Sequence, residues 1–103
     1  MNTEKTLMTF VREEKPDGSL GQPRGIIVAG FDEASRCVRM GWSFTNKSCG
    51  DSFNKKLGMK IAADRVHTDT DKQVPRLVLK QAERFYENCR RFFKTDNIHI
   101  AGM

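Results

Sequence analysis

Basic side chains at helical spacing are the most suggestive chemistry in the sequence. In the segment after Pro75 they recur at intervals of three, four or seven residues. At about 100° per residue they share roughly an 80° sector of a helix about 30 Å long, which could span several phosphates. Glu83 and Glu87 lie close to that sector, so an ordinary solvent-exposed helix face is the alternative interpretation. The row consists of Arg76, Lys80, Arg84, Arg91 and Lys94.

A second group of lysines surrounds the expected start of an earlier helix. Unpaired backbone N–H groups at a helix N-terminus favour an anion, which makes this segment a second candidate phosphate site. Asp51 would occupy or repel that site if it caps the helix, and a capped structural helix is then the alternative. The group consists of Lys47, Lys55, Lys56 and Lys60.

Residues suited to catalysis are present, but their spacing forms no recognisable site. Cys49 precedes the expected helix N-terminus, where thiol pKa values fall. His67 and His99 have no spacing that ties either of them to Cys49, and no ligand pair has the short separation of zinc sites. The chain also lacks the glycine-rich P-loop pattern. We therefore expect a binding protein rather than an enzyme, with no metal and no cofactor.

Trp42 and Phe44 offer aromatic surfaces with Arg36 and Arg39 nearby, an arrangement that can stack bases. In an alternating strand, however, Trp42 and Phe44 share a face with Val38 and Met40. Such a face is typical of a sheet covered on one side. We favour a core role for these aromatics over a stacking surface.

The elements that would position these side chains form one domain, residues 1–103. Apolar or alternating segments predict strands at 7–11, 25–31, 36–44 and 97–101. Two helices are expected, one from a cap at Asp51 or Ser52 to about Val66, and one from Pro75 to Lys94. The fold class is therefore α+β in β-β-β-α-α-β order, an antiparallel sheet of three or four strands with two helices packed on one face.

Apolar spacing predicts which helix faces are buried. In the first helix the expected buried edge is Phe53, Leu57 and Ile61, and Gly58 suggests close approach of another backbone. The second helix carries the clearest stripe in the chain, formed by Val78, Ala82, Phe85, Cys89 and Phe92.

Charge and cysteine content narrow the class of partner. The formal net charge is +5. Residues 1–46 hold six basic and six acidic side chains, whereas residues 47–103 hold twelve and seven, so the whole excess lies in the second half. This asymmetry favours an anionic partner.

Three cysteines, an odd number without C-x-x-C spacing, indicate reduced thiols in a cytoplasm. No apolar run approaches the roughly 18 residues that cross a bilayer, so we expect no membrane partner.

Two segments resemble short bacteriophage-encoded proteins of uncharacterised function. Residues 46–65, NKSCGDSFNKKLGMKIAADR, are similar to a D-x-F-x-K-K-x-G-x-x-I-A-x-x-R pattern in those proteins. Residues 83–94, ERFYENCRRFFK, are similar to their E-R-x-x-R-Y-F-K ending. The resemblance implies a phage-type protein that acts in the host cytoplasm by binding, without catalysis, on nucleic acid, host machinery or defence signals.

The leading hypothesis from the sequence is a non-catalytic binding protein for a phosphate-rich ligand, nucleic acid first, through basic helix faces in residues 47–94. The alternative is a host-takeover or anti-defence protein that binds a host protein or sequesters a small nucleotide signal. An uncovered sheet face or an edge strand would also invite a homodimer.

Overall fold

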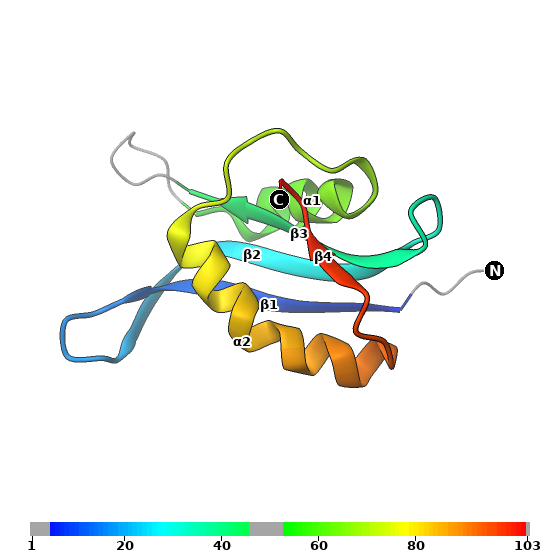
Figure 1. Ribbon diagram of the computed structural model, residues 1–103. Helices are drawn as coiled ribbons and strands as arrows, with labels where there is room; N and C mark the ends of the chain where they lie inside the picture. Colours follow the sequence, from blue (N-terminus) through cyan, green and yellow to red (C-terminus); the bar gives the residue numbers. More distant parts are fainter. Residues whose placement is uncertain (1–4, 46–52, 103) are drawn as a thin grey trace.

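A computed structural model describes residues 5–45 and 53–102. It is an α+β fold in the predicted β-β-β-α-α-β order (Figure 1). None of its helices in the described ranges is long and apolar enough to cross a membrane. The elements are β1 (Thr6–Glu14), β2 (Leu20–Asp32), β3 (Cys37–Phe44), α1 (Lys55–Thr68), α2 (Arg76–Phe93) and β4 (Ile98–Ile100).

The four strands form one mixed sheet in the order β1-β2-β3-β4. β1, β2 and β3 are an antiparallel meander, but β4 pairs parallel to β3. Val38 N donates to Asn97 O at 3.0 Å, and Ala101 N donates to Met40 O at 2.9 Å. The expectation of a purely antiparallel sheet is therefore wrong for the last strand. The chain reaches β4 through both helices, and a connection of that length allows parallel pairing.

The helices lie on opposite faces of the sheet, which corrects the expectation that both pack on one face. In β2, Ile27 and Ala29 belong to the core cluster that includes α2, whereas Ile26 and Val28 belong to the cluster that includes α1. Alternate residues of a strand point to opposite faces. The continuous apolar run in β2 is what a strand covered on both sides requires.

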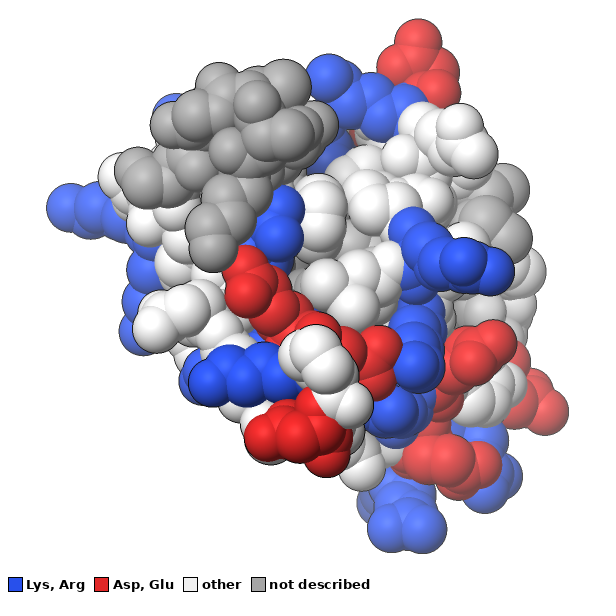
Figure 2. All heavy atoms as spheres, turned by 90° about the vertical axis from the view of Figure 1, so that its left-hand side faces the viewer, with Lys and Arg blue, Asp and Glu red and all other residues white. Residues whose placement is uncertain are grey.

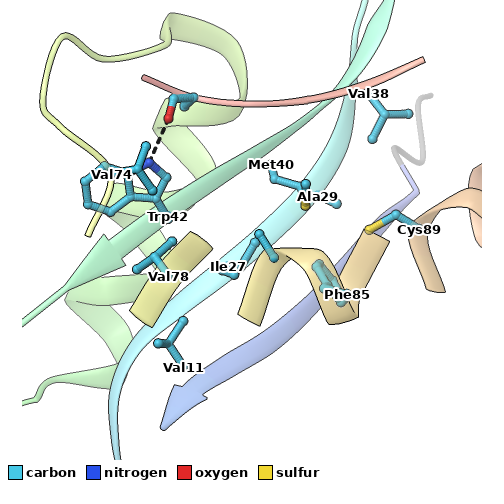
Figure 3. Packing of buried hydrophobic residues seen from close by; sticks show 12 residues of the cluster. Val11, Ile27, Ala29, Val38, Met40, Trp42, Val74, Val78, Phe85 and Cys89 are labelled. Atoms are coloured by element: carbon cyan, nitrogen blue, oxygen red, sulfur yellow. Dashed lines mark hydrogen bonds between the residues drawn. The ribbon is translucent and has the colours of Figure 1, made fainter. Parts of the chain in front are cut away.

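The larger core lies between α2 and the sheet (Figure 3). Val78, Phe85 and Cys89 project from α2 toward the strands, as the apolar stripe predicted. Trp42 is 4% exposed, and its Nε1 donates to Ala101 O at 2.8 Å. The core role of Trp42 is thus confirmed. Phe92, at the end of the predicted stripe, instead remains 38% exposed.

The buried face of α1 differs from the predicted one. Gly58, Ala62 and Val66 are buried, whereas Leu57 is 55% exposed. Phe53 does pack against this second cluster, and Ile61 is half-buried. Small residues let α1 lie directly on the sheet, so the larger apolar side chains end up at its flank.

The start of α1 also differs from the prediction. The N-cap is Asn54, whose side chain accepts a hydrogen bond from Leu57 N at 3.0 Å. The expected caps, Asp51 and Ser52, lie outside the described residues. For α2, Pro75 immediately precedes the first helical residue, close to the predicted start.

Candidate anion-binding site

The candidate cations do not gather on one surface, because α1 and α2 cover opposite faces of the sheet. Lys55, Lys56 and Lys60 are exposed on α1. The five cations of the α2 row, Arg76, Lys80, Arg84, Arg91 and Lys94, are exposed on the other side of the molecule. Lys47 lies outside the described residues. The two helices therefore present these eight side chains on opposite sides of the sheet.

Acidic side chains interrupt the α2 row. Glu14, at the end of β1, accepts a hydrogen bond from Lys80 Nζ at 2.8 Å and lies 3.9 Å from Arg84 Nη2. The Lys80 hydrogen bond lowers the pKa of Glu14, so this carboxylate stays ionised. Arg90, beside the row, pairs with Glu87 at 3.1 Å. In the described part of the chain, Arg76, Arg91 and Lys94 have no acidic side chain at ion-pair distance.

The side of the molecule at the left of Figure 1 also carries mixed charges. Figure 2 shows basic and acidic side chains interleaved over the lower half of one side of the molecule, around an uncharged centre. No uniformly basic face is visible from that side. Because Glu14 pairs with Lys80 and lies near Arg84, the α2 row has weaker attraction for a polyanion than its count of cations suggests.

A pocket of about 690 Å³ opens beyond the C-terminal end of α2. Its wall includes three aromatic side chains, Phe31 from β2 and Phe92 and Phe93 from α2. Its cations are Lys5, Arg36 and Lys94, and Glu33 is the acid among the described lining residues. Lys94 therefore belongs both to the α2 row and to this pocket, which we call the α2-end pocket.

Two aromatic rings of the α2-end pocket remain open to solvent. Phe31 is 46% exposed and Phe92 is 38% exposed. Phe92 packs edge-on against Phe93 with ring centroids 4.9 Å apart, and Lys5 Nζ lies 6.0 Å from the Phe92 centroid. Exposed rings beside cations can stack a planar group while the cations hold an attached anion.

A buried carboxylate, Asp32, lies beside one residue of this pocket, His67. Asp32 is 5% exposed and accepts a hydrogen bond from Ser35 Oγ at 2.7 Å. His67 Nδ1 lies 3.3 Å from Asp32, and Arg39 Nη1 lies 3.6 Å away. The pKa of Asp32 is held below its ordinary value, first by Ser35, then by His67, with a further contribution from Arg39. His67, whose side chain is 47% exposed, also lines the pocket.

The aromatic residues of β3 have a different cation from those the sequence suggested. Arg65 of α1 lies 4.5 Å from the Trp42 ring centroid and donates to Trp42 O at 2.8 Å. Burial lowers the pKa of Arg65. Arg39 is engaged with Asp32 and with Val66 O instead, and Arg36 lines the α2-end pocket. The expected grouping of Arg36 and Arg39 around Trp42 is therefore wrong.

The thiol expected to be most reactive cannot be placed, because Cys49 lies outside the described residues. Cys37 and Cys89 are unpaired and buried. Burial raises the pKa of Cys89 to about 12, which makes its thiol unreactive at neutral pH. Among the described residues, no group of three or more His, Cys, Asp or Glu side chains is placed to hold a metal ion.

Sequence reasoning missed most of the α2-end pocket. Lys5, Phe31 and Arg36 come from the N-terminal half, whose net charge is zero. A charge sum over a segment hides a local group of cations that the fold assembles. The only available signal was Phe31, which ends an apolar run directly before the polar turn at 32–35.

Comparisons with known proteins do not identify a family for this chain. No protein-family model matches the chain, and neither curated proteins nor solved structures gave a significant match.

Proposed function

We propose that this protein is a non-catalytic binding protein for a phosphate-rich ligand, namely single-stranded nucleic acid. The observation that carries the proposal is the pair of exposed rings, Phe31 and Phe92, in one pocket with Lys5, Arg36 and Lys94. Exposed rings stack unpaired bases of any sequence, whereas bases inside a duplex are already stacked.

The α2 row extends this site along the helix. Lys94 lies in the pocket, and Arg91, Arg84, Lys80 and Arg76 follow toward the start of α2. A strand with one base in the pocket would place its next phosphates along this exposed face. The acids Glu14, Glu83 and Glu87 weaken the attraction, so we expect modest affinity and little base specificity.

Binding of labelled single-stranded oligonucleotides, followed by fluorescence anisotropy, tests the proposal. With four or five phosphate contacts, the slope of log K against log salt should be about −3. Phe31→Ala and Phe92→Ala should each weaken binding roughly 5- to 150-fold, because stacking contributes about 1–3 kcal/mol per base. A duplex of the same sequence should bind more weakly than the single strand.

The opposite helix offers a control with the same change in net charge. Arg84→Glu with Arg91→Glu should abolish binding without unfolding the protein. Lys55→Glu with Lys60→Glu should leave the affinity nearly unchanged, because these lysines lie on the α1 side. Equal losses in the two double variants, or no binding by the unmodified protein at low salt, would overturn the proposal.

A second candidate is a phage-type anti-defence or host-takeover protein that sequesters a small nucleotide signal or binds a host protein. The pocket volume of about 690 Å³ favours a single nucleotide-sized ligand, since ligand pockets measure about 300–1,000 Å³. Native mass spectrometry of the protein from expressing cells separates the candidates. A bound nucleotide or a co-purifying host polypeptide supports the second, whereas a 260/280 absorbance ratio that falls at high salt supports the first.

Either function fits a cytoplasmic location in the host cell, which we include in the proposal. The unpaired thiols Cys37 and Cys89 are its support.

A further inference from the structure

The outer edge of β1 is the longest strand edge that pairs with no other strand among the described residues. β1 is the first strand of the sheet, with nine residues, whereas β4 at the other edge has three. Helices cover both sheet faces, so the uncovered face considered for a homodimer is not present. An edge strand of this length presents a row of backbone donors and acceptors for another strand.

The hydrogen-bonding direction along β1 follows from the register of the sheet. Thr45 N donates to Arg24 O, so the backbone of Arg24 faces β3. Because this direction alternates along a strand, Ile27 and Ala29 face β1, where their partners are Thr9 and Leu7. The intervening residues Thr6, Met8 and Phe10 consequently direct their backbone N–H and C=O groups away from the sheet.

Natural sheets protect such an edge with charge, proline or a very short strand. The segment Thr6–Val11, TLMTFV, has no charged residue and no proline, and its register with β2 is regular. Leu7, Met8, Thr9 and Phe10 are each only half-buried. Uncharged β-prone segments of about six residues are those that pair with other chains when left open.

The same segment is complementary to itself in the antiparallel direction. With Thr9 opposite Thr9, Met8 lies opposite Phe10 and Leu7 lies opposite Val11. Beyond Val11 the register of β1 shifts and Glu13 pairs with Arg24 at 3.4 Å, so the matched segment is limited to the uncharged residues Thr6–Val11. Met8 and Phe10 are both outward-bonding, so they form hydrogen-bonded pairs across the junction. A two-fold axis at Thr9 repeats every contact.

We propose that a second copy of this chain pairs with β1 through an antiparallel β1–β1 junction centred on Thr9. The dimer is a continuous eight-stranded sheet with both α2 helices on one face and both α1 helices on the other. This interface is independent of the proposed ligand, because it is formed by the backbone of β1.

Sedimentation equilibrium or light scattering over a range of concentrations tests the oligomeric state. The unmodified protein should show twice its monomer mass of 11.8 kDa. Met8→Pro removes an outward N–H but no bond to β2, so it should give a folded monomer. Met8→Val, which keeps the N–H, should remain a dimer. A monomer at several hundred micromolar unmodified protein would overturn the proposal.

Disulfide trapping tests the register even if the proline variant fails to fold. Directly opposed residues in a non-hydrogen-bonded antiparallel pair have Cα atoms about 4.5 Å apart, a distance that a disulfide can span. In a Cys49→Ser background, Thr9→Cys should form a cross-linked dimer on mild oxidation. Thr6→Cys should not, because Thr6 faces Arg12 in this register. Cross-linking of Thr6→Cys in preference to Thr9→Cys would contradict the proposed junction.

Discussion

Gly41 of β3 allows the backbone of α1 to pack closely against the sheet. A Cβ atom added there would lie 1.9 Å from Ala62 O and 2.8 Å from Val66 N. Both atoms belong to the backbone of α1, so no side-chain rotation can relieve the overlap. The position requires glycine because of close approach rather than an unusual backbone angle.

We predict that Gly41→Ala destabilises the protein by about 3 kcal/mol or more, because it overpacks backbone against backbone. Urea unfolding monitored by circular dichroism measures this loss. Gly21→Ala is the matched control, since its nearest contact is the flexible end of the Lys15 side chain at 3.3 Å. A stability loss of similar size in the two variants would contradict the explanation.

Asp32 should make stability depend on pH. Its pKa in the folded protein lies below the ordinary value of 3.8, because Ser35, His67 and Arg39 favour the carboxylate. The resulting stabilisation is complete above the unfolded pKa and is lost as pH falls through the folded pKa. We predict that Asp32→Asn is less stable than the unmodified protein at pH 7. The difference should shrink as pH falls below about 4.

Unfolding midpoints measured from pH 7 down to pH 3 test this sign. Ser35→Ala removes the largest cause of the shift while keeping the carboxylate, so it should give an intermediate pH dependence. A difference between Asp32→Asn and the unmodified protein that grows on acidification would refute the assignment.

At the scale of elements, α1 shows where an apolar pattern misleads. Phe53, Leu57 and Ile61 recur every four residues, which is a valid amphipathic spacing. The helix nevertheless buries Gly58, Ala62 and Val66, because these small side chains fit against Gly41 and Ser43. The small size of the residues on the facing strand determined which face of α1 is buried. The sequence pattern within the helix contains no information about that strand.

The orientation of α1 gives a paired prediction. Ala62→Asp places a charge at a position with no exposed surface, so it should cost about 4 kcal/mol or more. Leu57→Asp places the same charge at an exposed position, so it should change stability by only about 0.5 kcal/mol. Thermal unfolding compares the two. A larger stability loss for Leu57→Asp than for Ala62→Asp would contradict this orientation and support the buried face predicted from apolar spacing.

The strands and α2 could be predicted because their signals are local. Alternation in β3 and the stripe on α2 each specify the residues that meet in the larger core, without reference to the rest of the chain. The parallel pairing of β4 and the placement of helices on opposite faces depend on contacts between distant segments. The α2-end pocket depends on them too, since Lys5, the turn from Phe31 to Arg36, and Phe92 come from three separate parts of the sequence.

At the scale of the whole molecule, the last strand completes the core. Ala101 has no exposed surface, and its carbonyl accepts the Trp42 hydrogen bond. Trp42 is the single tryptophan of the chain. Its fluorescence therefore reports directly whether β4 is in place.

We predict that a chain shortened to end at residue 95 is less stable and exposes Trp42, shifting its fluorescence emission to longer wavelength. His99→Ala in the full-length chain is the control, because the His99 side chain is exposed. Unchanged emission from the shortened chain would show that β4 does not cover the indole.

The position of β4 also matters while the protein is being made. On a translating ribosome, β1, β2, β3 and both helices emerge before the segment that closes the β3 edge. Until residues 98–101 leave the exit tunnel, the nascent chain cannot bury Trp42 or complete its hydrogen bond to Ala101. During this interval the uncovered apolar surface around Trp42 is available to chaperones. A pause in synthesis just before β4 would lengthen the interval.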